Sequence, residues 1–344
     1  MGRRSPRLQK GRWRALSFIL RRLAFYLVAA WVAVTVNFFI PRLIPGNPVQ
    51  AIMAKFPGAL QPAAYNALVA ELGIGHQGSL WHQYVTYLDD VVHLNFGTDL
   101  TQYPASVSTV LGASVWWTLV LVGVATVIAF VIGTGLGILA GWRSGGWLDR
   151  ALPGLTFLQA IPYFFLALIV IQIFALSLNW FPAAGGYDGA NYSPGFNWPF
   201  ISNAIDYAFL PALTIVLTSV AGWMLQMRNV MVTTVGEDYV VAAQAKGLPD
   251  RRVIFTYAAR NALLPQLQGF GLALGFVVSG ALVMELVFGY PGIGKLLIDD
   301  VGSNDYPGMQ AIFLLITFAV LIANLIIDLV LVLFDPRVRA REAR

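Results

Sequence analysis

The 344-residue sequence contains no cysteine and only three histidines. The absence of cysteine excludes disulfide bonds and thiolate metal sites. His76, His82 and His93 are too scattered for the ligand spacing of a zinc site. Charged residues are also scarce, at 11% of the chain, against about a quarter in an ordinary soluble domain. Because 58% of the residues are hydrophobic, the composition indicates a membrane protein.

The hydrophobic residues gather in long runs, each close to the length of about 20 residues that a helix needs to cross a bilayer. Such runs predict helices, because backbone groups in lipid must be satisfied within the segment, whereas barrel strands alternate polar and apolar residues. We therefore expect an all-α, polytopic membrane protein. The six predicted transmembrane helices are 23–40, 116–140, 155–178, 209–227, 269–288 and 311–334.

The distribution of lysine and arginine predicts the orientation. All of the 22 basic residues except Arg42, Lys55 and Lys295 fall in segments on one side of the predicted helices. Since basic residues near membrane helices are retained in the cytoplasm, both termini are expected to be cytoplasmic. The net charge of +5 is then a topology signal, and no nucleic-acid partner is expected.

The chain divides into a basic N-terminal tail, residues 1–22, and a six-helix domain, residues 23–344. A basic start followed by an apolar run is also typical of a signal peptide. However, the run is long for a signal peptide, and "PRLIPGNP" follows it without a small-x-small cleavage site. An uncleaved first membrane helix is the favoured interpretation.

Three segments outside the predicted membrane helices are long. The outer segment 41–113 contains two predicted amphipathic helices, "PAAYNALVAELG" and "WHQYVTYLDDVVHL". The outer segment 180–207 is rich in aromatic residues. Trp and Tyr collect at membrane interfaces, so this segment fits an interfacial belt with partner docking, and stacking on a substrate is the alternative. The third segment, 228–266, is cytoplasmic in the predicted topology.

The cytoplasmic segment predicts a helix, a glycine turn and a second helix. Glu237 and Asp238 suit the first turn of a helix, where carboxylates meet the positive end of the dipole. Gly247 suits the left-handed position that ends this helix. A second amphipathic helix is predicted over 251–262 and is expected to stop before Pro265.

Small residues are frequent in the first of these helices and its turn, at Ala242, Ala243, Ala245 and Gly247. They predict a compact surface that fits into the groove of a partner. The alternative is that the alanines only raise the helix propensity of a solvated loop.

The spacing of Ala242, Ala243 and Gly247 resembles the EAA loop in the membrane subunits of bacterial ATP-binding-cassette (ABC) importers. The run "DYVVAAQAKGL" and the later "RNALLP" are similar to the dipeptide, oligopeptide and nickel branch of these permeases. Val241 stands where the general motif has glutamate, and Leu264-Pro265 lies later than in the general motif. Further stretches that match the branch are "RLIPGNP", "LDRALPG", "IPYFFLAL", "LPALTI", "ELVFGYPGIGKLL" and "FDPRVR".

The resemblance implies a type I ABC importer transmembrane domain in the bacterial cytoplasmic (inner) membrane. In this family the EAA loop is the coupling helix that docks on the ATPase. It implies a second homologous permease subunit, two ATP-binding-cassette ATPase subunits and an extracytoplasmic substrate-binding protein as partners. ATP and Mg²⁺ would be used by the ATPase subunits, and we expect this chain to bind no cofactor or metal and to catalyse no reaction. The residues expected to couple to the ATPase are Glu237, Asp238, Tyr239, Ala242, Ala243, Ala245, Lys246 and Gly247.

The resemblance leaves the substrate open between oligopeptides, which are slightly favoured, and oligosaccharides. The alternative function is a stand-alone, ion-coupled secondary transporter. Such proteins often contain inverted repeats and interrupted helices, and the sequence reveals neither clearly.

The stretch "GYPGIGKLL" matches the start of a phosphate-binding loop, but Leu296 replaces the hydroxyl residue that holds magnesium. The predicted topology also places this stretch on the outer side. We therefore expect a Gly/Pro turn and a short helix over 293–301 at the outer mouth, with a role in binding-protein docking or gating. The outer-mouth residues are Glu285, Tyr290, Pro291, Gly292, Gly294 and Lys295.

Glycines and acids inside the predicted helices complete the expectations. Gly133, Gly137 and Gly141 form a small-residue ridge that allows a close helix crossing, as static packing or, alternatively, as a moving gate. Glu285 and Asp328 interrupt apolar runs, where ionisable groups are costly. We favour a structural or pathway role for Glu285 and a packing role for Asp328 over a proton relay, which would require further partners.

Overall fold

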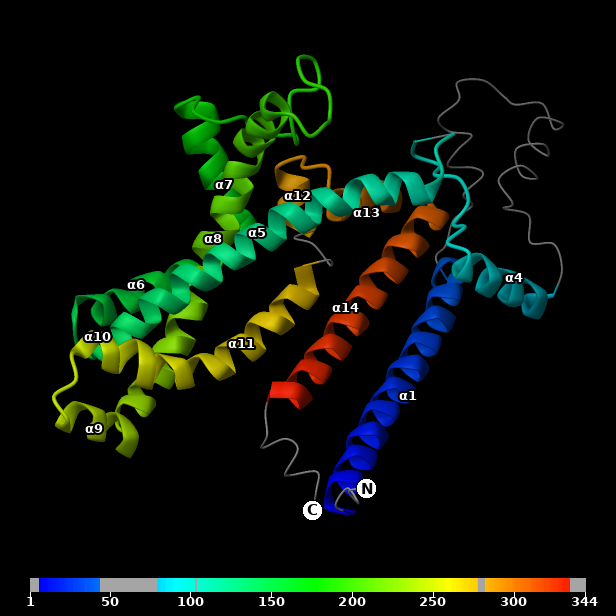
Figure 1. The fold of residues 1–344 in the computed structure, drawn as a ribbon. Helices are drawn as coiled ribbons and strands as arrows, with labels where there is room; N and C mark the ends of the chain where they lie inside the picture. The colour runs from blue at the N-terminus through cyan, green and yellow to red at the C-terminus, as the bar shows by residue number, and fades with distance from the viewer. Residues whose placement is uncertain (1–5, 44–78, 103, 278–281, 335–344) are drawn as a thin grey trace, which may run out of the picture. The chain divides into compact units, whose positions relative to one another are not determined.

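The computed structural model describes residues 6–43, 79–102, 104–277 and 282–334 (Figure 1). These residues form helices joined by turns, with an isolated β-bridge between Thr98 and Ser106. The chain divides into two compact units, residues 1–113 with 297–344 and residues 114–296. The all-helical fold class is confirmed.

The first unit is built on two long antiparallel helices, α1 (Pro6–Leu43) and α14 (Tyr306–Phe334), which lie side by side in Figure 1. Buried Asn37 donates from Nδ2 to the Gln310 carbonyl at 2.9 Å, and Gln310 Nε2 donates to the Asn37 carbonyl at 3.1 Å. This reciprocal pair fixes the register of the two helices. The unit also contains α4 (Leu80–Val92), the start of α5 and most of α13 (Ile293–Ser303).

The second unit is organised around α8 (Trp198–Val235), which contacts α6, α7 and α11. Three buried clusters of mostly aliphatic side chains and methionines hold these helices together. The other elements are α5 (Val107–Trp142), α6 (Trp147–Ala160), α7 (Tyr163–Val170), the π-helix η1 (Ile171–Ser177), α9 (Asp238–Ala245), α10 (Asp250–Arg252), the π-helix η2 (Val253–Ala258), α11 (Ala259–Phe276) and α12 (Leu282–Val287).

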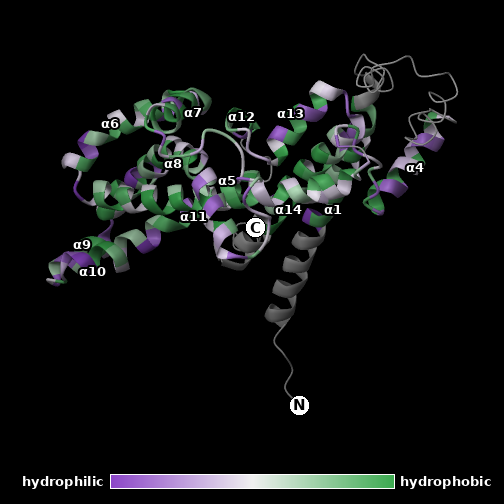
Figure 2. Cartoon of the chain, turned by 90° about the horizontal axis from the view of Figure 1, so that it is seen from above, coloured by the Kyte–Doolittle hydropathy of each residue, from purple (hydrophilic) through white to green (hydrophobic). Residues whose placement is uncertain are grey.

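Within the described residues, four helices are long and apolar enough to cross a membrane, or five if one bent pair forms a single span. These four helices correspond to the predicted spans 23–40, 116–140, 209–227 and 311–334. The predicted span 269–288 is divided between α11 and α12, with 278–281 outside the described residues. Figure 2 shows hydrophobic residues along the long helices and hydrophilic residues gathered around α9 and α10.

The prediction of one continuous helix over 155–178 is wrong. The chain bends by 93° between α6 and the helical run 163–177. Ile161 is extended, with ψ of 126°, because the ring of Pro162 disfavours the helical conformation in the preceding residue. The bend therefore has a local cause that is visible in the sequence.

Pro265 does not end the second helix of the cytoplasmic segment, contrary to expectation. Helix α11 continues through Pro265 to Phe276, and buried Gln266 donates from Nε2 to the Trp223 carbonyl at 3.3 Å. Proline is tolerated in membrane helices because neighbouring helices and local adjustments satisfy the freed backbone groups.

The glycine ridge lies against α8, as the small-residue spacing predicts. A Cβ atom at Gly133 would lie 2.6 Å from the Val220 carbonyl oxygen, and one at Gly137 would lie 2.6 Å from the Met224 carbonyl oxygen. At Gly141 a Cβ atom would lie 2.4 Å from Met231 Cβ. Helices α5 and α8 thus approach each other at backbone distance, and whether the contact moves is untested.

Several sequence expectations fall at the edges of the described structure. The predicted helix "WHQYVTYLDDVVHL" is confirmed as α4, whereas "PAAYNALVAELG" and most of "RLIPGNP" and "FDPRVR" lie outside the described residues. From Pro6 onward the basic tail belongs to α1. Asp328 lies in the last part of α14, where side chains are not described.

Candidate coupling site and outer turn

Helix α9 and its turn have the predicted local structure. The helix runs from Asp238 to Ala245, with Glu237 as N-cap, and Gly247 has a φ of +72°. The Gly247 N–H donates to the Gln244 carbonyl at 2.8 Å and the Leu248 N–H to the Ala243 carbonyl at 3.4 Å. This Schellman arrangement satisfies the last carbonyls of the helix and requires a left-handed residue, which glycine adopts without strain.

The small residues of α9 divide between two faces. Ala243 is 3% exposed and packs in a cluster with Met227, Met231 and Val253, so it belongs to the core of the unit and not to an exposed docking surface. Ala243 is thus not on the exposed face of α9, and its expected part in coupling stays a prediction. The exposed face contains the remaining expected coupling residues Glu237, Asp238, Tyr239, Ala242, Ala245, Lys246 and Gly247.

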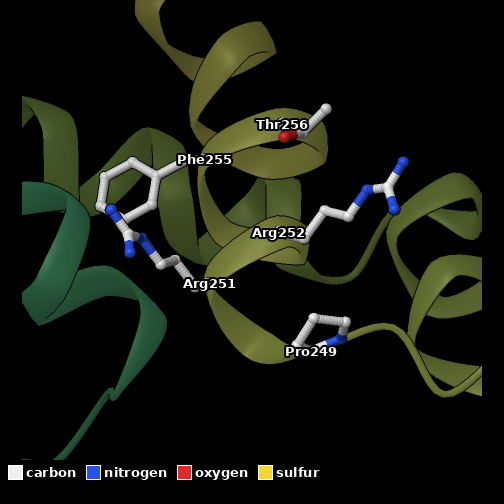
Figure 3. Close-up of a pocket in the computed structure, with 5 residues that line it drawn as sticks. All are labelled: Pro249, Arg251, Arg252, Phe255 and Thr256. Atoms are coloured by element: carbon white, nitrogen blue, oxygen red, sulfur yellow. The ribbon is translucent and has the colours of Figure 1, made fainter.

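A shallow pocket follows the glycine turn and is lined by Pro249, Arg251, Arg252, Phe255 and Thr256 (Figure 3). Figure 3 shows the two arginine side chains extending to opposite sides of the turn, with Arg251 on the side of Phe255. Phe255 is 54% exposed. A pocket lined by an exposed aromatic ring and two arginines is suited to contact with a protein surface.

Asp149 and Arg228 form an ion pair that joins α6 to α8. The Arg228 guanidinium donates to both carboxylate oxygens, from Nε at 2.8 Å and from an Nη atom at 3.1 Å. The Gly145 N–H also donates to Asp149 at 2.8 Å. Paired hydrogen bonds of this kind fix orientation as well as charge. The sequence indicates only a topology role for Arg228, because its partner lies 79 positions away.

Glu285 is the centre of the segment 285–295, which joins α12 to α13 and is called the outer turn after the side of the membrane predicted for it. Its side chain is fully buried and accepts a hydrogen bond from Thr118 Oγ1 at 2.8 Å and one from the Gly294 N–H at 2.6 Å. Thr118 Oγ1 in turn accepts the Ile293 N–H at 2.8 Å. Because α13 begins at Ile293, the carboxylate occupies the anion-binding position at the N-terminus of a helix.

The glycines of "GYPGIGKLL" allow this close approach. A Cβ atom at Gly292 would lie 2.3 Å from a Glu285 oxygen, and one at Gly294 would lie 2.6 Å from Leu282 Cα. Tyr290 is buried, and its ring meets Trp117 edge to face at 5.6 Å. The predicted short helix is confirmed as α13, and the backbone N–H that a phosphate loop would offer to a nucleotide serves Glu285.

The aromatic-rich segment has both packed and exposed members. Tyr187 stacks on Trp117 with ring centroids 5.9 Å apart and meets Phe200 edge to face at 5.3 Å. Trp180, Phe196 and Trp198 are exposed. The two tryptophans are suited to an interface, because each has an apolar ring system and a polar N–H group. Packing within the unit therefore accounts for only some of these aromatic residues.

The described sites combine buried polar networks with an exposed helical turn. Asp149 and Glu285 are committed to partners within the fold, and the exposed groups gather at a helical turn beyond α8. These features define a polytopic helical membrane protein in which an exposed helix and a glycine turn follow the candidate membrane helix α8.

The family model described as "Binding-protein-dependent transport system inner membrane component" matches residues 133–340, and the chain belongs to this family. The chain is 32% identical to the di/tripeptide transport system permease protein DppB of Pseudomonas aeruginosa, over 94% of this chain and 99% of the relative. It is 32% identical to the dipeptide transport system permease protein DppB of Escherichia coli K12, over 95% and 100%. It is 30% identical to the oligopeptide transport system permease protein AppB of Bacillus subtilis, over 94% and 99%. The resemblance drawn from the motifs is confirmed.

Proposed function

We propose that this chain is the permease subunit of an ATP-driven importer and forms part of the translocation pathway for oligopeptides. The relatives named above, similar over nearly their whole length, are peptide permeases, and this observation carries the choice of substrate. The proposed topology has six spans with both termini in the cytoplasm, on the basis of the distribution of basic residues.

The proposed partners are two ATPase subunits, a second homologous permease and an extracytoplasmic binding protein. The ATPase would dock on the exposed face of α9, where Tyr239 is 40% and Val241 is 50% exposed, and on the neighbouring pocket with Arg251 and Phe255. Ala243 would act from behind this face, by holding α9 against the core of the unit. Nucleotide-driven closure of the ATPase would then shift the permease between two states by differential binding.

The outer turn and the exposed aromatic residues are proposed to serve the opposite side. Trp180 and Trp198 would contact the membrane interface or the docked binding protein. The Glu285 network would hold the turn 289–295 in one shape, so that it offers a defined surface to that partner.

Uptake by the reconstituted transporter tests the function. Proteoliposomes that contain both permeases and both ATPase subunits, together with the binding protein, should accumulate labelled oligopeptides only when ATP is supplied. Oligosaccharides of similar size, assayed in parallel, should not accumulate. Uptake driven by an ion gradient without ATP would support a secondary transporter instead, and preferred uptake of oligosaccharides would overturn the substrate assignment alone.

The docking surface is tested by Ala242→Arg, which places a long cationic side chain on the exposed face of α9. We expect at least a tenfold loss of ATPase-subunit binding and a parallel loss of substrate-stimulated hydrolysis, because the added side chain prevents close approach. Ala190→Arg makes the same change at an exposed alanine far from α9 in the sequence and should leave ATPase binding unchanged. Normal binding and stimulation in Ala242→Arg would remove α9 from the interface.

A further inference from the structure

Three aspartates from distant parts of the sequence converge within the first unit. Asp99 lies in the loop before α5, Asp300 lies in α13, and Asp305 lies in the turn before α14. Their side chains are 1%, 0% and 0% exposed, and one carboxylate oxygen from each lies within 4.8 Å of the others. Figure 1 shows the start of α14 beside the loop that precedes α5. Three acidic groups therefore share a site that is shielded from solvent.

Backbone donors orient two of the three carboxylates. Asp99 Oδ1 accepts from the Thr101 N–H at 2.8 Å, the Thr101 hydroxyl at 2.6 Å and the Gln102 N–H at 2.7 Å. Asp305 accepts from the Gly308 N–H at 2.9 Å through Oδ1 and from the N–H groups of Leu100 and Thr101 through Oδ2. These bonds hold Asp99 and Asp305 in place and tie the loop 99–102 to the start of α14.

Asp300 differs from both neighbours, because neither of its carboxylate oxygens has a hydrogen-bond partner although the residue is fully buried. A Cβ atom at Gly308 would lie 2.3 Å from Asp300 Oδ2, so the carboxylate lies directly against the backbone of α14. An unpartnered buried carboxylate is costly unless another group satisfies it. The orphaned oxygens of Asp300, beside two oriented carboxylates, are therefore suited to bind a ligand.

The charge balance indicates the sign of that ligand. Within the described part of the chain, no lysine or arginine forms a salt bridge with any of the three aspartates. The site therefore favours a bound positive charge.

We propose that Asp99, Asp300 and Asp305 bind a hard divalent cation, with Ca²⁺ as the preferred ion. All three side chains offer carboxylate oxygens, which suit hard cations such as Ca²⁺ and Mg²⁺, whereas softer metals favour thiolate or imidazole ligands. Ca²⁺–oxygen distances of about 2.3–2.6 Å allow opposite ligands about 5 Å apart, which the 4.8 Å spread of the oxygens satisfies. The site would clamp the loop 99–102 to the turn between α13 and α14.

The simplest alternative to a bound cation is one proton shared among the three carboxylates, and a proton neutralises less charge than a divalent cation does. One proton would leave two negative charges among three buried carboxylates, whereas a divalent cation neutralises two and gives an orphaned oxygen of Asp300 a partner. Ca²⁺ is preferred over Mg²⁺ because it accepts irregular geometry, while Mg²⁺ demands a near-ideal octahedron and retains several waters. The choice of Ca²⁺ also accords with the outer location in the proposed topology, but the site itself is independent of the proposed substrate.

Thermal unfolding of the full-length chain in its purified transporter complex tests the site. At a Ca²⁺ concentration ten times the dissociation constant, the unfolding midpoint should rise by about 2–4 °C relative to EGTA. Asp300→Asn keeps the shape of the side chain and should abolish the shift. Asp299→Asn makes the same substitution at the adjacent, exposed residue, and this variant should still show the Ca²⁺-dependent rise of the unfolding midpoint.

Terbium luminescence gives a second readout that does not depend on stability. Tb³⁺ should bind to the wild-type complex and be displaced by Ca²⁺, and Asp300→Asn should lose this displaceable signal. If Asp300→Asn does not fold, Asp99→Asn takes its place in both measurements. A wild-type complex that shows neither a Ca²⁺ shift nor displaceable Tb³⁺ overturns the proposal, as does an unchanged response in the folded aspartate variant. A response to Mg²⁺ but not to Ca²⁺ overturns the choice of ion.

Discussion

Thr118 makes two hydrogen bonds that join α5 to Glu285 in α12 and to the start of α13. Its hydroxyl donates to Glu285 and accepts the Ile293 N–H, and the residue is fully buried. Thr118→Val should therefore lower stability by about 1–3 kcal/mol, because it leaves a backbone donor unpaired and removes a donor from a buried carboxylate. Chemical or thermal unfolding of the purified complex measures the change.

Thr214→Val is the matched control. Thr214 is also fully buried, but its hydroxyl donates to the Leu210 carbonyl within its own helix. The loss of stability in Thr214→Val should be well below that in Thr118→Val, since the Leu210 carbonyl remains within the hydrogen-bonded backbone of the helix. Equal losses in the two variants would show that the Thr118 network contributes nothing beyond a buried hydroxyl.

Residue-level prediction from the sequence succeeded where the signal was chemical and failed where the partner was distant. Glu285 was singled out because a carboxylate interrupts an apolar run, and the structure gives it defined partners. Thr118 could not be chosen, since one threonine in a membrane helix resembles another and Thr118 is 167 positions from Glu285. The same limit applied to Asp149 and Arg228.

The contact between α5 and α8 depends on glycine at three successive positions one helical turn apart. Gly137→Ala would force a Cβ atom to within 2.6 Å of the Met224 carbonyl oxygen and 2.7 Å of Met227 Cβ. The two helices must separate, at a cost of about 1–3 kcal/mol. A lowered unfolding midpoint of the complex is the expected result.

Gly135→Ala makes the same substitution on the same helix, where a Cβ atom would meet nothing within 4 Å. It should leave the midpoint unchanged or raise it, because alanine has a higher helix propensity by up to about 1 kcal/mol. If Gly137→Ala is no worse than Gly135→Ala, the packing interpretation of the ridge is refuted.

Element boundaries could be predicted where local residues determine them. The start of α9 at carboxylates and the turn at Gly247 follow from capping preferences, and the start of α13 follows from the Gly/Pro turn before it. The bend at Pro162 was missed because the hydropathy of 155–178 outweighed the proline signal, and the stop at Pro265 was expected because that signal was given too much weight. At Pro162 the preceding residue leaves the helical conformation, whereas at Pro265 the chain stays helical and α11 packs against α8.

The cysteine-free chain allows a direct test of the proposed topology. Ser144, between α5 and α6, and Ser193, between η1 and α8, are both exposed and can each be replaced by a single cysteine of similar shape. A membrane-impermeant maleimide should label Ser193→Cys in intact cells and Ser144→Cys only after permeabilisation. The reverse pattern, or labelling of both from outside, would contradict the orientation derived from the basic residues.

At the scale of the whole chain, composition and charge distribution predicted a helical membrane protein, and the motifs predicted its family. The aspartate cluster was beyond reach, because the loop at Asp99 lies about 200 positions from Asp300 and Asp305 and only the folded chain brings them together. Acidic residues in outer segments are common, so their number alone gave no signal.

The position of Glu285 has a consequence for any attempt to build nucleotide binding into the outer turn. The carboxylate is a tethered anion, held at an effective concentration that a free phosphate in solution does not reach. An external nucleotide would have to displace it from the Gly294 N–H before binding. Restoring a hydroxyl residue at position 296 would therefore not create an ATP site, because the chain already supplies its own competitive ligand.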